Sequence, residues 1–219
     1  MTPPATALRG LYAITSAGLG ADRARLLAAA EAAVRGGAAL LQFRDKTDDA
    51  AGRRASARAL AELCRAHGAR LIINDDVALA LDCGADGVHL GAADAPLARA
   101  RAALGPRAIL GASCGPWLER ARAAAAAGAD YLAFGRFFPS RTKPDAPPAT
   151  LELLRQARAQ WSLPLCAIGG VTPANAPALI AAGADMIAAV EGVFGDMEPA
   201  SVETAARAYK RLFEKTAKP

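Results

Sequence analysis

The sequence predicts an α/β fold: a closed (β/α)8 barrel of the TIM type, built as a single domain. Short apolar runs alternate with Ala-, Leu- and Arg-rich stretches of helical length along most of the 219 residues. The apolar runs are continuous, as in parallel strands that are covered on both faces. Repeated βα units without a break in composition are typical of this barrel, and we expect one domain over residues 1–219 with a core at about 10–216.

Each expected strand is followed by a helical stretch. A Gly-Ala pair often separates a helix from the next strand, because helices commonly end in a glycine with positive φ. The expected strands are Tyr12–Thr15, Ala39–Phe43, Arg70–Asn74, Gly87–Leu90, Ala108–Ala112, Tyr131–Phe134, Leu165–Ile168 and Met186–Val190. The expected helices are Asp22–Arg35, Asp48–Ala66, Val77–Leu81, Pro96–Leu104, Pro116–Ala127, Thr150–Gln160, Pro173–Ala182 and about Ser201–Thr216. A doubly wound sheet is the alternative, but no early Gly-x-Gly-x-x-Gly motif supports it.

Composition narrows the classes of partner. The net charge of +5 is modest and the Arg residues are spread along helical stretches, while aromatic residues make up only 5%, which argues against nucleic acid. Small anionic molecules suit this charge better. The four cysteines have no metal-binding spacing and are expected to be reduced thiols. Without a membrane-length apolar run or a signal-peptide pattern, we expect a cytoplasmic protein with no membrane partner; the sequence leaves its oligomeric state open, a homo-oligomer included.

Polar residues follow the second expected strand. Because side chains alternate along a strand, Gln42, Arg44 and Lys46 should point the same way. An amide and two cations at a strand end suit a phosphorylated or electron-rich ligand. The alternative is an ordinary salt bridge between Arg44 and a neighbouring carboxylate.

Carboxylates follow the third and fourth expected strands. Asn74, Asp75 and Asp76 end one strand, and Asp94 follows the next. Mg²⁺ prefers oxygen ligands and is commonly held by one or two carboxylates plus substrate phosphate. The alternative is that Asp75 and Asp76 merely cap the following helix. These two loops are the candidate metal site.

The fourth and fifth expected strands carry a histidine and a serine. His89 lies inside its strand, where a packed and hydrogen-bonded role is favoured over a general base. Ser113 ends the fifth strand and can donate a hydrogen bond to a ligand. Since no histidine follows Ser113 in the sequence, we expect neither Ser113 nor Cys114 to act as a nucleophile.

The three last loops are expected to bind anions. The longest, residues 135–148, carries Ser140, Arg141, Thr142 and Lys143 between prolines. A loop of this length in a small domain is usually functional.

Two glycines, Gly169 and Gly170, follow the seventh strand, where backbone N–H groups can approach a phosphate. The eighth strand closes with Val190, and Glu191 comes directly after it. Loops seven and eight are the frequent phosphate site of such barrels, although glycine pairs also serve plain turns.

From about Gly10 to Gly195, the chain resembles the thiamine phosphate synthase (thiamine-phosphate pyrophosphorylase) family. The resemblance rests on the order and spacing of five motifs: QFRDK at 42–46, INDD at 73–76, HLGAAD at 89–94, FGRFFPSRTKP at 134–144 and IGGVTPAN at 168–175. It implies a transferase that joins 4-amino-2-methyl-5-hydroxymethylpyrimidine diphosphate to hydroxyethylthiazole phosphate with the help of Mg²⁺, releasing pyrophosphate.

The resemblance also implies roles for residues of this chain. Asp75 and Asp94 would hold the metal. Arg44, Lys46, Ser113 and Lys143 would be catalytic. The substrate-binding residues would be Gln42, Phe43, Arg44, Asp45, Lys46, Asn74, Ser113, Ser140, Arg141, Thr142, Lys143, Gly169, Gly170, Val190 and Glu191.

One position departs from the family. Glu191 stands where a small or hydroxyl residue is usual, and a carboxylate there would repel a phosphate. A thiazole tautomerase is a rival, but that family places a histidine shortly after the serine that corresponds to Ser113. A sugar-phosphate isomerase or epimerase would need a base or metal at the strand ends, where His and Glu are scarce. A non-catalytic protein that binds thiamine precursors is a further alternative, opposed by the retained Asp75, Asp94 and Lys143.

Overall fold

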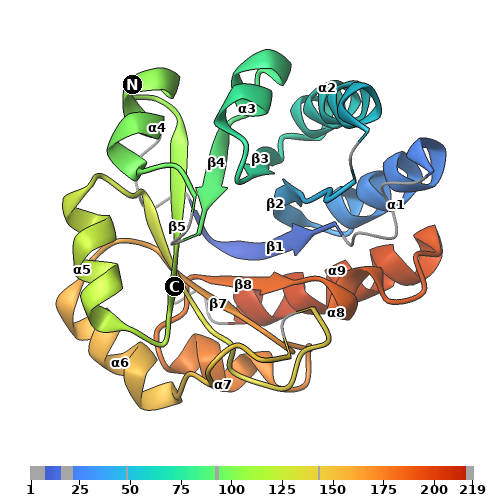
Figure 1. The fold of residues 1–219 in the computed structure, drawn as a ribbon. Helices are drawn as coiled ribbons and strands as arrows, with labels where there is room; N and C mark the ends of the chain where they lie inside the picture. The colour runs from blue at the N-terminus through green and yellow to red at the C-terminus, as the bar shows by residue number, and fades with distance from the viewer. Residues whose placement is uncertain (1–7, 16–21, 48, 92–93, 143, 216–219) are drawn as a thin grey trace.

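Eight parallel strands form a closed barrel in the computed structural model, which describes residues 8–15, 22–47, 49–91, 94–142 and 144–215. Each strand pairs with its neighbour in the sequence, and β1 pairs with β8 to complete the ring (Figure 1). The strands are β1 (Gly10–Ile14), β2 (Ala38–Phe43), β3 (Arg70–Asn74), β4 (Gly87–Leu90), β5 (Ile109–Gly115), β6 (Tyr131–Phe134), β7 (Leu165–Ile168) and β8 (Met186–Ala189). The predicted fold class is confirmed.

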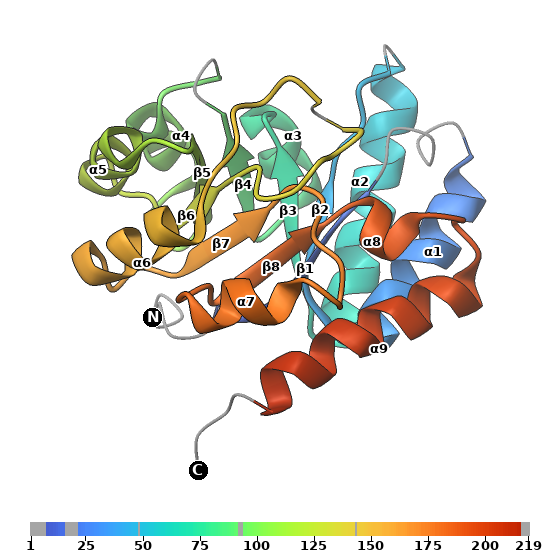
Figure 2. The ribbon, with the colours of Figure 1, turned by 90° about the horizontal axis from the view of Figure 1, so that it is seen from below.

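Helices surround the strands (Figures 1 and 2). They are α1 (Arg23–Arg35), α2 (Ala50–His67), α3 (Val77–Cys83), α4 (Leu97–Leu104), α5 (Leu118–Ala126), α6 (Leu151–Gln160), α7 (Ala176–Ala181), α8 (Glu191–Phe194) and α9 (Pro199–Lys215). Side chains of Asp22, Asp49 and Thr150 accept hydrogen bonds from backbone N–H groups of the first turns of α1, α2 and α6. No helix in the described part of the chain is long and apolar enough to cross a membrane.

The predicted strands all exist: β3, β4, β6 and β7 have the predicted bounds, and the ends of β1, β2, β5 and β8 are shifted. The largest shift is in β5, which continues to Gly115, so that Ser113 lies within the strand and not after it. The short helix α8, which begins at Glu191, was not predicted. The predicted start of the second helix at Asp48 lies outside the described residues.

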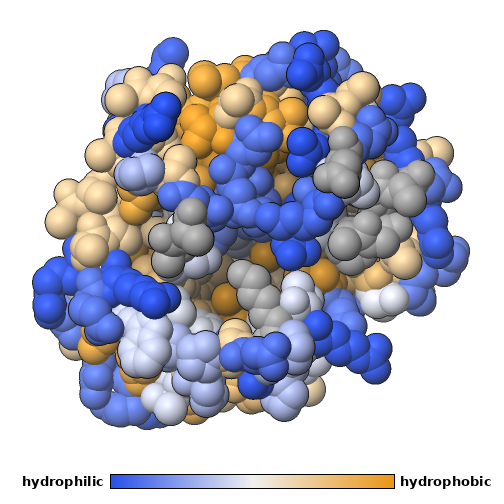
Figure 3. Space-filling model, in the orientation of Figure 1, coloured by the Kyte–Doolittle hydropathy of each residue, from blue (hydrophilic) through white to orange (hydrophobic). Residues whose placement is uncertain are grey.

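The strands bury both faces. Tyr12, Leu40, Ile72 and Tyr131 belong to a cluster inside the barrel, while alternate residues such as Phe43 pack in a larger cluster between strands and helices. This explains why the apolar runs are continuous. Figure 3 shows hydrophilic side chains across the middle of the face seen in Figure 1, and a hydrophobic area over α3.

Aspartates at the amino ends of β4, β6 and β8 clamp the preceding strands. Asp130 shows the pattern: its N–H donates to Leu110 O (2.7 Å), its Oδ2 accepts from Leu110 N (2.7 Å), and Arg101 pairs with the same carboxylate (2.6 Å). Asp86 makes the same pair of bonds with Leu71, and Asp185 with Leu165. The recurring Gly-Ala-Asp sequence is thus a structural device of the fold.

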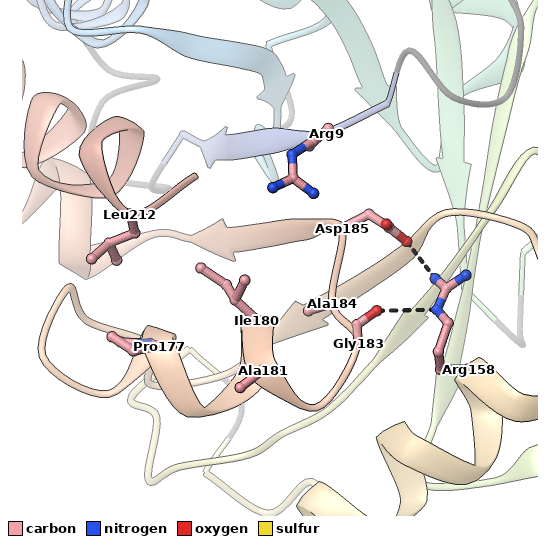
Figure 4. Close-up of a pocket in the computed structure, with 9 residues that line it drawn as sticks. All are labelled: Arg9, Arg158, Pro177, Ile180, Ala181, Gly183, Ala184, Asp185 and Leu212. Atoms are coloured by element: carbon pink, nitrogen blue, oxygen red, sulfur yellow. Dashed lines mark hydrogen bonds and ion pairs between the residues drawn. The ribbon is translucent and has the colours of Figure 1, made fainter. Parts of the chain in front are cut away.

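A cavity of about 690 Å³ opens at the same end of the barrel (Figure 4). It lies beside the clamp of Asp185, whose partner Arg158 also donates to carbonyl groups of Gly183, Trp161 and Leu163. These bonds hold the ends of α6 and β7 together. The cavity is therefore at the amino ends of the strands, opposite the strand ends that carry the predicted site.

We expect Asp130→Ala to lower the free energy of unfolding by about 2 kcal/mol, because Arg101 and the Leu110 N–H both lose a charged acceptor. Chemical denaturation measures this change. The exposed Glu119→Ala in α5 is the control and should change stability by less than about 0.5 kcal/mol. Equal values for the two variants would contradict the clamp.

Candidate active site

The predicted site residues that the structure describes lie at or just beyond the carboxyl ends of the strands. β2 carries Gln42, which is buried inside the barrel, and leads to the half-buried Arg44. Phe43 packs outward against the helices, as alternation requires. Asp45 accepts a hydrogen bond from Thr47 N (2.8 Å) and shapes the loop. Arg44 makes no ion pair with any described residue, so the structure does not support the alternative that a salt bridge accounts for it.

Asp75 and Asp76 divide two tasks. Asp76 caps α3 by accepting a hydrogen bond from Leu79 N (2.9 Å). Asp75 adopts a left-handed conformation (φ 64°), which aspartate tolerates better than most residues, and its N–H donates to His89 O (2.9 Å). The turn carries the Asp75 carboxylate to Lys46, whose Nζ lies 2.7 Å from Oδ2. The capping alternative therefore holds for Asp76 alone.

The carboxyl groups of Asp75 and Asp94 interact. Burial acts to raise the pKa of Asp75, but hydrogen bonds to Lys46 and Asp94 outweigh it and hold that pKa below its ordinary value. Burial and the neighbouring Asp75 raise the pKa of Asp94. Gly91 N donates to Asp94 Oδ2 (2.6 Å) and fixes this carboxyl group. Two adjacent carboxyl groups of this kind favour a shared proton or a cation.

This pair fits a magnesium ion and not a closed metal cage. Within the described residues no group of three His, Cys, Asp or Glu side chains could hold a metal. Mg²⁺ retains waters and needs only one or two carboxylates together with phosphate oxygens. The donor chemistry of Asp75 and Asp94 meets that requirement.

His89 and Ser113 touch each other across neighbouring strands. His89 Nε2 lies 2.8 Å from Ser113 Oγ, and Nδ1 lies 2.9 Å from the hydroxyl of Tyr131. The prediction of a packed, hydrogen-bonded His89 is confirmed. No histidine follows Ser113 in the sequence, but the preceding His89 contacts it in space, because β4 and β5 are neighbours although 24 residues separate the two side chains. Burial raises the pKa of the Cys114 thiol to about 12, so Cys114 is no nucleophile.

The loop between β6 and α6 projects beyond the strand ends (Figure 2). Arg136 braces it by donating to the carbonyl groups of Pro144 (2.9 Å) and Ala146 (2.8 Å). Ser140 is half-buried, and the neighbouring Arg141 and Thr142 are exposed. Lys143 lies outside the described residues.

Gly169 and Gly170 support this loop from below. Both have positive φ (103° and 61°), and a Cβ on either residue would collide with the loop, 2.3 Å from Arg136 Cβ and 2.2 Å from Pro139 O. Phe138 N also donates to Gly169 O (3.0 Å). Glycine is required here for packing, a role that the sequence did not predict.

At the end of β8 the chain turns into α8. A Cβ on Gly192 would lie 2.3 Å from the hydroxyl of Tyr209, which donates to Val171 O (2.8 Å). This buried bond ties α9 to the loop after β7. Val190 is half-buried at the start of the turn, and the half-exposed Glu191 pairs with Arg141 at 3.7 Å. The departure at Glu191 is thus matched by a cation from the long loop.

The fold and the residues at its carboxyl end define an enzyme of the (β/α)8-barrel class. A family model described as thiamine monophosphate synthase matches residues 11–193. The chain is 54% identical over 214 residues to a thiamine-phosphate synthase of Thioalkalivibrio sulfidiphilus, covering 98% of this chain and 100% of that protein. The chain belongs to the thiamine monophosphate synthase family, and is a transferase of thiamine biosynthesis.

Solved structures agree. A thiamine phosphate pyrophosphorylase from Pyrococcus furiosus superposes with a TM-score of 0.86 at 32% identity, over 99% of this chain and 100% of that one. A thiamine phosphate pyrophosphorylase from Bacteroides thetaiotaomicron (TM-score 0.69, 15% identity; 95% and 100% covered) shares the fold. A geranylgeranylglyceryl phosphate synthase from Thermoplasma acidophilum (0.68, 18%; 95% and 94% covered) shares it too.

Asp76→Ala should lower the free energy of unfolding by about 1 kcal/mol through loss of the α3 cap, with turnover changed by less than about threefold. Thermal or chemical unfolding and a steady-state assay measure the two effects. Asp76→Asn, which keeps a capping oxygen, is the matched control and should restore stability. A large loss of turnover in Asp76→Ala would show that Asp76 contributes to the active site and is not only a helix cap.

Proposed function

We propose that the protein condenses 4-amino-2-methyl-5-hydroxymethylpyrimidine diphosphate with hydroxyethylthiazole phosphate to give thiamine monophosphate and pyrophosphate. The observation that carries the proposal is the 54% identity to a thiamine-phosphate synthase across 98% of the chain. The site supports it, because cations and paired carboxylates at the strand ends suit a diphosphate accompanied by a divalent cation.

The reaction is a dissociative displacement. The bond between the pyrimidine methylene carbon and the diphosphate oxygen breaks, and the electron pair leaves with pyrophosphate. The electron-rich ring stabilises the resulting cation, and the thiazole nitrogen then forms the new C–N bond. No protein nucleophile is required, which agrees with the high pKa of the Cys114 thiol.

Charge neutralisation is the main task of the protein. Lys46, with Arg44 and Lys143, would offset the negative charge that grows on the leaving pyrophosphate. The Lys46 side chain is 54% exposed, so it can turn from Asp75 to a bound diphosphate. Mg²⁺ would be held by Asp75 and Asp94 and, when bound, supplies further positive charge to the leaving group.

The remaining residues would hold and align the substrates. Gln42, Asn74 and Ser113, at the carboxyl ends of β2, β3 and β5, would bind the pyrimidine. For the thiazole phosphate we propose Ser140, Arg141 and Thr142 with backbone groups of Gly169 or Gly170 and of Val190 and Glu191. Bringing the two substrates together at attack distance supplies the proximity term.

The absence of nucleic-acid and membrane partners, a cytoplasmic location and assembly as a homo-oligomer stay predictions from the sequence.

The direct test is pyrophosphate release after mixing the purified protein with both substrates, with and without Mg²⁺. We expect release only when both substrates and Mg²⁺ are present. Binding of the thiazole phosphate without any release would overturn the synthase proposal in favour of a tautomerase or a binding protein.

Asp75→Asn and Lys143→Ala should each lower turnover by at least about a hundredfold, the effect of losing one preorganised electrostatic contact. Asparagine tolerates the left-handed conformation of Asp75, so the backbone should be preserved. Calorimetry of pyrophosphate binding gives a second readout: binding to the native protein should require Mg²⁺, and Asp94→Ala should abolish it. Near-normal turnover in either variant would refute the role of that residue.

Glu191→Gln should lower KM for the thiazole phosphate about twofold to fivefold, because it removes a negative charge beside the proposed phosphate position. Its ion pair with Arg141 is exposed, so the free energy of unfolding should change by less than about 0.5 kcal/mol. Steady-state kinetics at saturating pyrimidine diphosphate measure KM. A rise in KM would mean that the pair organises the phosphate loop.

A further inference from the structure

Five polar side chains form one chain of hydrogen bonds through the inside of the barrel. Gln42 Nε2 lies 2.6 Å from the Tyr12 hydroxyl, which lies 2.9 Å from the Tyr131 hydroxyl. Tyr131 contacts His89 Nδ1 at 2.9 Å, and His89 Nε2 contacts Ser113 Oγ at 2.8 Å. The chain joins β2, β1, β6, β4 and β5. Its two ends, Gln42 and Ser113, are residues that we propose to contact the pyrimidine substrate.

The donors in this chain can be assigned from its first member. An amide nitrogen can only donate, so Gln42 donates to the Tyr12 hydroxyl. The Tyr12 proton then goes to Tyr131, and the Tyr131 proton goes to His89 Nδ1. Burial raises the pKa of both tyrosines, so both hydroxyls keep their protons.

The assignment fixes the state of His89. Because Nδ1 accepts from Tyr131, Nε2 carries the ring proton and donates it to Ser113 Oγ. In this state His89 cannot take the proton of Ser113. The contact between these two residues therefore does not form a nucleophile and base.

Close packing holds the hydroxyl groups in place. The rings of Tyr12 and Tyr131 meet edge to face at 5.9 Å, and His89 stacks on Tyr131 at 5.6 Å. The Tyr131 ring fits only because position 111 is glycine, where a Cβ would lie 2.0 Å from Tyr131 Cζ. Because this packing fixes both rings, breaking one hydrogen bond should change which of the neighbouring groups donates and which accepts.

We propose that Tyr12, Tyr131 and His89 are positioning residues that set the hydrogen-bond polarity of Gln42 and Ser113, and thereby select a pyrimidine with an amino group. This inference rests on the proposed function. With one of its two amide N–H groups bound to Tyr12, Gln42 has its carbonyl oxygen as an acceptor for a ligand, which suits an amino donor. With its oxygen bound by His89, Ser113 offers its proton to an acceptor atom of the substrate.

The polarity can be reversed by one isosteric change. In Tyr131→Phe the Tyr12 proton loses its acceptor, and it is satisfied again only if the Gln42 amide rotates so that Oε1 accepts from Tyr12. Gln42 would then present its N–H₂ group to the ligand, which suits a carbonyl oxygen. Tyr12→Phe, in contrast, removes the partner of Gln42 and leaves the amide free to adopt either orientation.

The test compares two ligands, the 4-amino pyrimidine diphosphate and its 4-oxo analogue, by calorimetry with Mg²⁺. We expect the native protein to bind the amino compound at least about a hundredfold more tightly. Tyr131→Phe should reduce this ratio at least tenfold, mainly by improving binding of the oxo analogue. Tyr12→Phe should reduce the ratio mainly by weakening binding of the amino compound, which keeps the test decisive if Tyr131→Phe does not fold.

Tyr209→Phe is the matched control. Tyr209 is equally buried and its hydroxyl donates a hydrogen bond to Val171 O, but it lies outside the hydrogen-bonded chain. It should lose a similar amount of stability without changing the amino-to-oxo ratio. If Tyr12 and Tyr131 had only a structural role, their substitution would weaken the binding of both ligands equally. The amino-to-oxo ratio would then stay at the native value, and this result would overturn the inference.

Nitrogen-15 spectra of the histidines provide a second readout. The chain contains only His67 and His89, so His67→Gln assigns the signals. The native spectrum should show His89 protonated on Nε2 alone, and Tyr131→Phe should change this tautomer. A native His89 protonated on Nδ1 would overturn the assignment of donors.

The two proposals can fail separately. Absence of pyrophosphate release by the native protein would refute the proposed function. Release by the native protein, together with a native amino-to-oxo ratio in folded Tyr12→Phe and Tyr131→Phe, would refute the positioning role alone.

Discussion

Closure of the barrel is the constraint on which the rest of the structure depends. Pairing of β1 with β8 removes both sheet edges and encloses an interior that only side chains can fill. A polar group in that interior has no water to bind and must find a protein partner. This rule explains the hydrogen bonds that join Gln42, Tyr12 and Tyr131 inside the barrel. Closure of the barrel excludes water, and these polar groups therefore bind one another.

The two ends of the barrel differ in what their charges do. At the amino ends, three carboxylates bind arginine side chains and strand N–H groups, which fixes the strands relative to one another. They belong to Asp86, Asp130 and Asp185. At the carboxyl ends, Lys46 pairs with a partly buried Asp75 whose carboxyl group also meets Asp94. The carboxylates at the first end are satisfied within the fold, whereas the Lys46 and Asp75 side chains at the second end remain 54% and 29% exposed.

The sequence predicted the strands and the residues at their ends because both signals are local. A continuous apolar run marks a buried strand, and polar residues follow directly after it. The contact of His89 with Ser113 depends on the pairing of β4 with β5, and that of Tyr12 with Tyr131 joins residues 119 apart. A local sequence pattern does not show which residues of two different strands will lie side by side. The glycines at 169 and 170 were recognised, but the need to accommodate Arg136 and Pro139 follows only from how the long loop packs.

The depth of each polar group suggests how the substrates are oriented. Gln42 and the two tyrosines are almost completely buried and make neutral hydrogen bonds, while Lys46 and Asp75 stand at the rim with substantial exposure. Burying a diphosphate among the neutral groups would strip its charges of water without compensation. A planar heterocycle loses far less on entering that region. The pyrimidine ring should therefore point into the barrel and its diphosphate toward the rim, where the leaving group can meet its cations and depart into solvent.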